Sequence, residues 1–267
     1  MREIYLLLLV FSMSTNLISQ ISYDSIIKPR EEIYISENDS IVIKKTLNNI
    51  NLNFLCDNKL TNLFRTNVFN FSNESSKTVY YLKQWNTPIV VLFDKKIPTE
   101  VTSKFKLFFK QLSTVKNLSI KYTSKIEDAN YLIKITDDKI NKHINKVKFK
   151  SKEEKTNHFL YNATYSIQTD GNDKLYSAIL KINKKEFNDT VLLKKLKQLF
   201  FISLGNFKVF PLNKKNSLLD FNYHNNAIIS EDDLNFIKHL YSINYQQKIN
   251  GTTFNKLIKL AKRKCFK

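Results

Sequence analysis

The clearest pattern of apolar and polar positions in the chain lies between Asp189 and Gly205. Apolar or small side chains recur there at spacings of three and four residues, which is typical of a helix buried along one stripe. The positions are Leu192, Leu193, Leu196, Leu199, Phe200 and Ser203. Asn188 or Asp189 can cap the first turn, and Gly205 can end the helix in a left-handed conformation. The pattern therefore predicts a long helix whose leucine stripe faces a sheet.

Apolar runs before this helix predict strands. The run Ile89–Phe93 is continuously apolar and too short for a helix, so it predicts a strand covered on both faces. Asp170-Gly171 lies between two alternating runs, Phe159–Gln168 and Leu175–Ile182. Because Gly accepts the positive φ of a tight turn, this segment predicts a hairpin. Two further strands are predicted at Leu118–Tyr122 and Tyr131–Ile135.

Three other stretches carry helix signals. Pro98-Thr99-Glu100 starts one helix, with Thr99 as the expected cap. Ser230-Glu231-Asp232-Asp233 is a capping box at the start of a second. Phe254–Lys264 is amphipathic with a basic polar face, so it either docks on the domain or lies on a membrane surface. The basic stretch Lys139–Lys155 predicts a solvated loop, the alternative being a phosphate-binding arm.

The N-terminal residues are predicted to be an export signal. Its apolar run, Leu6–Phe11, has about half of the roughly 20 residues that a membrane span needs. Residues 1–20 are therefore predicted to be a cleaved signal peptide rather than a retained anchor. Residues 21–84 are predicted to be an extension that packs against the main domain, and residues 85–267 to form that domain.

The chain is strongly basic, with 43 Lys and Arg against 24 Asp and Glu and a formal net charge of +19. Such an excess attracts anionic partners, although the even spread of lysines also fits a coding bias. Cys56 and Cys265 are the two cysteines. They either pair across nearly the whole exported chain or remain two thiols, since sequence alone does not place them within bonding distance.

Short sequence pieces with a recurring order carry a family resemblance. They are Trp85-Asn86-Thr87-Pro88-Ile89, Asp128-Ala129-Asn130, Leu196-Lys197-Gln198, Ser203-Leu204-Gly205-Asn206, Ser217-Leu218-Leu219, Ile229-Ser230-Glu231-Asp232-Asp233-Leu234, Leu240-Tyr241 and Ile249-Asn250-Gly251. From Trp85 to about Thr253, the chain resembles a family of secreted bacterial proteins of unknown function with a degenerate, metzincin-like domain of the zincin superfamily. The resemblance implies an α+β fold: a twisted mixed sheet, a long helix of the active-site type behind it, and C-terminal helices. It also implies a cleft where a protease would hold zinc.

The helix lacks the residues that zinc chemistry needs. A zincin helix carries His-Glu-x-x-His, which places two imidazoles and a water-activating carboxylate on one face. With Leu204-Gly205-Asn206 as the helix end, those positions fall near Lys194, Lys195 and Gln198. An ammonium group has no lone pair to give, and an amide is a poor zinc ligand. No His, Glu or Cys lies between Phe187 and Tyr223.

We therefore expect no zinc site, no cofactor and no catalytic residues here. With the leucine stripe facing the sheet, Lys194, Lys195 and Gln198 are expected to be at least partly exposed and, with His224 from the following loop, to line the cleft. The departure from the zincin pattern predicts a secreted or envelope pseudoenzyme with a metallopeptidase-like fold.

Its expected partner is a peptide or an anionic envelope polymer. One alternative is a peptidase-like hydrolase with an unrecognised site. Another is a basic surface protein that binds anionic lipid or polysaccharide through peripheral membrane contact. Glycine-rich phosphate loops are absent, and no aromatic nucleic-acid motif accompanies the basic residues, so neither a nucleotide nor nucleic acid is expected.

Overall fold

The computed structural model describes residues 52–71, 78–140, 148–185, 187–212, 214–243 and 248–265. All of these residues belong to one compact unit, Val42–Lys267. The predicted signal peptide, residues 1–20, lies outside the described residues. So does much of the predicted extension over 21–84, of which residues 52–71 and 78–84 are described.

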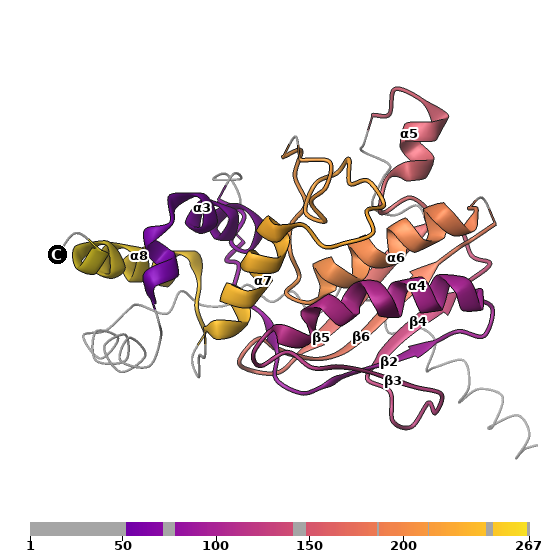
Figure 1. The fold of residues 1–267 in the computed structure, drawn as a ribbon, viewed down its shortest axis with the longest axis horizontal. Helices are drawn as coiled ribbons and strands as arrows, with labels where there is room; N and C mark the ends of the chain where they lie inside the picture. Colours follow the sequence, from indigo (N-terminus) through magenta and orange to yellow (C-terminus); the bar gives the residue numbers. More distant parts are fainter. Residues whose placement is uncertain are drawn as a thin grey trace, which may run out of the picture. The chain divides into compact units, whose positions relative to one another are not determined.

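Six strands of the described chain form one sheet (Figure 1). They are β1 (Gln84–Trp85), β2 (Ile89–Phe93), β3 (Ile120–Thr123), β4 (Tyr131–Ile135), β5 (Ala163–Thr169) and β6 (Lys174–Ile182). Their order is β1-β6-β4-β2-β3, with β5 paired to β6. Only β5 runs antiparallel to its neighbour, so the sheet is mixed and mostly parallel.

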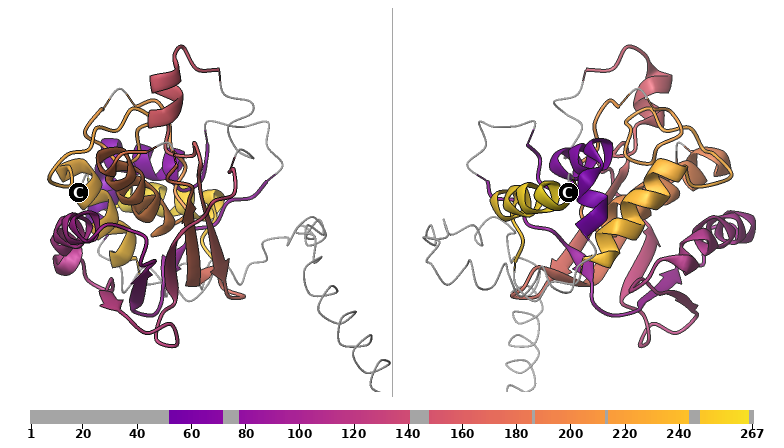
Figure 2. Two further views of the ribbon diagram at one scale, coloured as in Figure 1. Left: turned by 90° about the vertical axis from the view of Figure 1, so that its right-hand side faces the viewer. Right: turned by 60° about the vertical axis from the view of Figure 1, so that its left-hand side comes forward.

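Helices accompany the sheet. The described residues form α3 (Asn58–Asn67), α4 (Thr99–Phe109), α5 (Lys152–Asn157), α6 (Asp189–Ser203), α7 (Glu231–Ser242) and α8 (Gly251–Cys265), with two short 3-10 helices, η1 (Leu52–Cys56) and η2 (Lys110–Thr114). Helices α4 and α6 lie side by side over one face of the sheet (Figures 1 and 2). None of these helices is long and apolar enough to cross a membrane.

The strand β2 differs from its prediction in one respect. Its bounds are as predicted, but only one of its faces is fully covered. Ile89 and Val91 are fully buried, whereas Val90 and Leu92 are half-buried. The strand register places the latter two on the face that also carries the exposed Lys134 and Lys181. The expectation of cover on both faces is therefore wrong for β2, because alternate residues of a strand point to opposite faces.

The predicted hairpin is confirmed as β5 and β6, with a different residue at the tight position. Asp173 has a φ of 61°, and Gly171 is not left-handed. The Asp170 carboxylate explains the turn, because Oδ1 accepts hydrogen bonds from the backbone of Asn172 at 2.8 Å and of Lys174 at 2.9 Å. Asp tolerates the left-handed region better than most residues, so the turn does not depend on glycine.

Helix starts follow the predicted caps at two of three places. Asn188 Oδ1 accepts a hydrogen bond from the Val191 amide at 2.9 Å, and Ser230 caps α7 through the Asp233 amide at 3.2 Å. Thr99 does not cap α4, because it is the first helical residue and Pro98 takes the cap position. A proline has no side-chain acceptor, so α4 begins without a side-chain cap.

The end of α6 also differs from its prediction. Asn206, with a φ of 55°, is the left-handed residue, and Gly205 is not. Gly205 instead gives room, because a Cβ there would lie 2.2 Å from a ring carbon of Phe207. Two side chains satisfy the last carbonyls of the helix: Tyr241 Oη donates to Leu204 O at 2.8 Å, and Trp85 Nε1 donates to Ser203 O at 3.4 Å.

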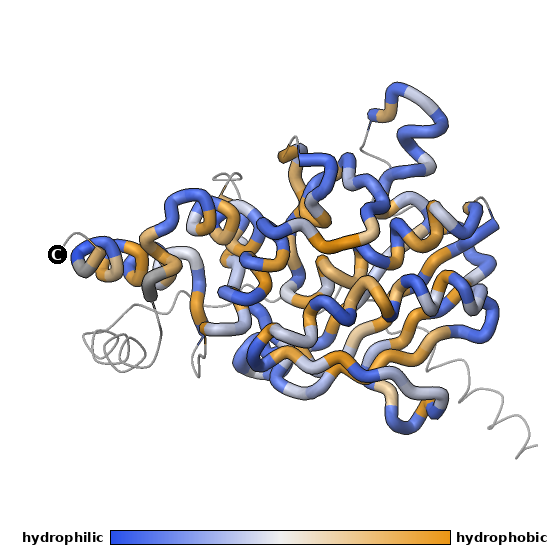
Figure 3. The backbone as a smooth tube through the Cα atoms, in the orientation of Figure 1, coloured by the Kyte–Doolittle hydropathy of each residue, from blue (hydrophilic) through white to orange (hydrophobic). Residues whose placement is uncertain are grey.

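An aromatic layer joins the sheet to its helices. Phe200 of α6 lies 4.6 Å from Phe109 and 5.1 Å from Phe105 of α4, measured between ring centres. Its ring is also 4.9 Å from that of Tyr131 on β4. Coloured by hydropathy, the strands are largely apolar and many of the segments that connect them are polar (Figure 3). Burial of these rings therefore fixes α4 and α6 against the sheet.

The described part of the extension packs on the C-terminal helices. The Phe64 ring of α3 lies 4.9 Å from Phe236 of α7 and 5.4 Å from Phe254 of α8. Cys56 and Cys265 form a disulfide between η1 and the end of α8. Of the two states left open by the sequence, the structure thus has the bridge. It also has α8 docked through its apolar face.

The basic stretch over 139–155 is partly helical. Residues 152–157 form α5, whose cap is the Ser151 side chain, so the prediction of a loop is wrong there. All residues of this helix are at least partly exposed, as expected of a solvated segment. Residues 141–147 lie outside the described chain.

Candidate functional site

Helix α6 carries the predicted candidate residues, and it is covered on almost every side. Lys194 is half-buried, which confirms its expected partial exposure. Lys195 and Gln198 are fully buried, with 0% of each residue exposed. Their predicted exposure is therefore wrong. The physical reason is that the segment around His158 and the loop after α6 pack over the polar side of the helix.

Lys195 is held by a carbonyl and by aromatic rings. Its Nζ donates a hydrogen bond to the backbone carbonyl of His158. It lies 4.6 Å from the ring centre of Phe187 and 5.8 Å from that of Tyr161. No carboxylate of the described chain forms an ion pair with it. Burial, followed by the charge of Lys194, lowers the pKa of the Lys195 ammonium to about 7. Near neutral pH this group is thus present in both protonation states.

Lys197 binds the loop over 225–226, which follows α6 in the chain. Its Nζ donates to Asn225 Oδ1 at 2.9 Å and to the Asn226 carbonyl at 2.7 Å. It also lies 4.2 Å from the ring centre of Phe108. Burial, followed by the charge of Lys104, lowers the pKa of Lys197 to about 8. The side chain joins α6, α4 and the loop over 225–226.

Gln198 binds a third segment. Its Nε2 donates to the Asp220 carbonyl at 2.7 Å and to the Leu218 carbonyl at 3.2 Å. Both partners are acceptors, so the orientation of the amide is fixed. The Oε1 atom is buried without a hydrogen-bond partner among the described residues. Gln198 therefore acts as a double donor toward the backbone of the loop.

A buried carboxylate holds the same loop from α7. Asp233 accepts hydrogen bonds from Ser217 Oγ and from the Leu218 amide, both at 2.7 Å. Burial raises the pKa of Asp233, and the hydrogen bonds from Ser217, Leu218 and Ser230 oppose that rise. The loop over 217–220 is thus fixed between α6 and α7.

The two histidines near this region have different surroundings. Burial, followed by the charges of Lys195 and Lys194, lowers the pKa of His158 to about 4, so its imidazole is neutral at physiological pH. Its Nδ1 accepts a hydrogen bond from the Leu160 amide at 3.3 Å. His224, the fourth predicted candidate, is exposed on the covering loop. Among the described residues, no hydrogen bond joins its side chain to α6.

The arrangement has a clear chemical character. The three side chains Lys195, Lys197 and Gln198 each use N–H donors on backbone or amide oxygens of segments that cover α6. In the described ranges, no three His, Cys, Asp or Glu side chains are grouped so that they could hold a metal ion. The geometry therefore fits a polar core that fastens loops to the helix.

Sequence reasoning missed Lys197 and the Ser217–Asp233 pair. The sequence did contain a signal for Lys197. The polar residues at 194, 195, 197 and 198 span more than one face of the helix, and the positions before and after them are apolar. Such a helix is either amphipathic with an exposed polar face or buried with satisfied polar groups. Local spacing does not distinguish these cases.

Comparisons with known proteins add no family assignment: no family model matches the chain, and no curated protein matches it.

Proposed function

We propose that this is an exported, zincin-like protein in which α6 stabilises the domain instead of holding zinc. It acts by binding an anionic partner, a peptide or an envelope polymer, and not by hydrolysis. The architecture supports the zincin-like part of this proposal. A mixed sheet, a long helix against β5 and β6, and C-terminal helices occur in the order that the family resemblance implies.

One observation carries the non-catalytic part. Of the three side chains at the expected ligand and base positions, Lys195 and Gln198 are fully buried and donate to carbonyls of the covering segments. The third, Lys194, is half-buried, and its ammonium group has no lone pair for a metal. A catalytic zinc site needs lone-pair donors and an open coordination position for water. Donors that already hold the covering segments supply neither.

Charge supports the nature of the partner. The net charge of +19 favours binding of anions, with an affinity that weakens as salt screens the attraction. The disulfide between Cys56 and Cys265 supports export, because such bonds persist in oxidising compartments.

Binding and cleavage assays on the exported chain, residues 21–267, test this function directly. We expect it to bind fluorescent polyglutamate, with an affinity that falls between about 50 and 300 mM salt, because these span the range in which the Debye length shrinks below 10 Å. We also expect no cleavage of casein. Casein cleavage would contradict the proposal in favour of the hydrolase alternative. Failure to bind polyglutamate would contradict the peptide form of the proposal. Binding to phosphatidylglycerol vesicles alone would favour the lipid alternative.

A further inference from the structure

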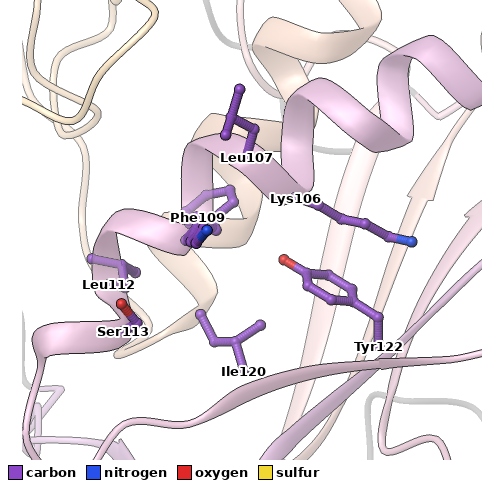
Figure 4. Close-up of a pocket in the computed structure, with 8 residues that line it drawn as sticks. Lys106, Leu107, Phe109, Leu112, Ser113, Ile120 and Tyr122 are labelled. Atoms are coloured by element: carbon purple, nitrogen blue, oxygen red, sulfur yellow. The ribbon is translucent and has the colours of Figure 1, made fainter.

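A pocket of about 410 Å³ lies between α4, its continuation η2 and the strand β3 (Figure 4). Its lining residues are Lys106, Leu107, Phe109, Lys110, Leu112, Ser113, Ile120 and Tyr122. Ile120 and Tyr122 face the helix from the strand, and Lys106 runs beside the Tyr122 ring (Figure 4). This volume is within the range of about 300–1,000 Å³ usual for ligand sites, and the lining is mostly apolar, as such sites usually are.

The pocket adjoins a strand edge that has no partner in the described chain. β3 is the last strand in the sheet order and pairs only with β2 there. The Ile89 amide donates to the Ser119 carbonyl at 2.8 Å, which directs the backbone groups of Ser119 toward β2. Backbone groups alternate in direction along a strand, so those of Ile120 and Tyr122 point to the open edge. The two residues that line the pocket thus also present hydrogen-bonding groups beside it.

The surroundings of the pocket are basic. Between residues 101 and 126 the chain has six lysines and no Asp or Glu. They are Lys104, Lys106, Lys110, Lys116, Lys121 and Lys125, and all six are exposed. Lys106 Nζ lies 5.1 Å from the ring centre of Tyr122, which holds a positive charge at the pocket rim. Leu107, with 70% of its surface exposed, adds apolar area next to these charges. An occupant with both acidic and apolar groups matches this surface.

We propose that the β3 edge binds an extended acidic peptide, which adds as a strand to β3 and inserts an apolar side chain into the pocket. An open strand edge provides main-chain hydrogen bonds, and a pocket that receives one side chain of an alternating strand provides specificity. Acidic residues two positions before and after that side chain lie on the same face of an extended peptide, where Lys106 and Lys110 attract them. This inference rests on the proposed binding of anionic partners and assigns it to one site and one class of ligand.

Binding of a defined probe by the exported chain tests the site. The probe is a fluorescein-labelled nonapeptide with Phe at its centre, Glu at the other odd positions and Val at the even positions, so that Phe and Glu share one face of the extended peptide. Lys106→Glu with Lys110→Glu should weaken binding about tenfold or more, because attraction at the pocket becomes repulsion. Lys134→Glu with Lys181→Glu is the matched control, since it removes the same net charge from exposed strand positions on the other face of the sheet. We expect the control to change binding less than about twofold.

Two further changes separate strand addition from simple charge attraction. Ser113→Trp, at an exposed lining position, should fill the pocket and weaken binding about tenfold without lowering the melting temperature. Two further probes carry N-methyl groups on alternate peptide nitrogens, one at the odd residues and the other at the even residues. One of the two should lose binding and the other should keep it, because only one edge of the peptide would pair with β3.

Each other outcome has a distinct meaning. Equal weakening by both charge-reversal pairs, or equal binding of both methylated peptides, would overturn the site while leaving anionic binding intact. Absence of polyglutamate and probe binding by the unaltered chain would overturn the proposed function itself. Binding of phosphatidylglycerol vesicles, lost in the Lys106→Glu, Lys110→Glu variant while the probe does not bind, would assign the pocket to an anionic lipid.

Discussion

Lys195 shows most directly that the polar side of α6 is buried. It is fully buried, and its ammonium group is bound by a carbonyl and two aromatic rings in place of a carboxylate. Carbonyl dipoles and ring faces compensate a charge only in part, so burial favours the neutral amine. The unfolding free energy therefore depends on pH through Lys195, and this dependence can be measured.

We predict that the unfolding free energy rises with pH between about 7 and 9 and that Lys195→Met reduces this rise. The pKa of Lys195 is lowered from 10.5 to about 7, so between these values the unfolded chain binds more protons than the folded one. Stability then increases with pH, by at most about 1.4 kcal/mol per pH unit for one such group. Lys197 contributes in the same direction, because its pKa is lowered to about 8.

Urea unfolding at pH 7, 8 and 9 measures this effect. The control is Lys134→Met, at an exposed position, which should keep the slope of the unaltered protein. An identical slope in Lys195→Met and the unaltered protein would show that Lys195 is solvated in the folded state.

At the scale of elements, α6 is fixed by its leucine stripe and by its polar side chains together. The stripe was predictable, because its three- and four-residue spacing is a local property of the sequence. The strands β2 and β4 were predicted with their observed bounds for the same reason, and the Asn188 and Ser230 caps follow from side chains adjacent to their helices.

The burial of Lys195 and Gln198 was not predictable from local spacing. Their acceptors belong to His158, Leu218 and Asp220, which are 20 to 37 residues away in the chain. Whether such segments cover a helix depends on tertiary packing. The left-handed turn residues were also mispredicted, since Asp173 and Asn206 take positions that glycine was expected to occupy.

Three alanine variants test both sides of α6. Leu196→Ala should lower the unfolding free energy by roughly 2–5 kcal/mol, because a fully buried leucine leaves a cavity. Gln198→Ala should cost about 1–3 kcal/mol, because two buried carbonyls lose their donor. Lys194→Ala, at the half-buried position, should change stability by less than about 0.5 kcal/mol.

Denaturant melts of these three variants provide the measurement. A severe effect of Lys194→Ala with a mild effect of Leu196→Ala would mean that the helix has the opposite orientation.

At the scale of the whole described unit, distant segments of the chain are joined in two ways. The disulfide bridges residues 209 positions apart and ties η1 to α8, which closes the packing around Phe64. Sequence left this bond open because the cysteines say nothing about their separation in space. The pocket beside β3 was likewise not predictable, since it requires the edge position of the strand and the approach of η2 to it.

We propose that α6 has a structural role at the position where a zincin would hold its metal. Elemental analysis of residues 21–267, purified without added metal, tests this most directly when it is combined with thermal melts in chelator. We predict no stoichiometric zinc and an unchanged melting temperature, because Lys195 and Gln198 use their polar groups to bind the covering segments. One equivalent of tightly bound zinc, with a melting temperature that falls in chelator, would contradict the structural role of α6.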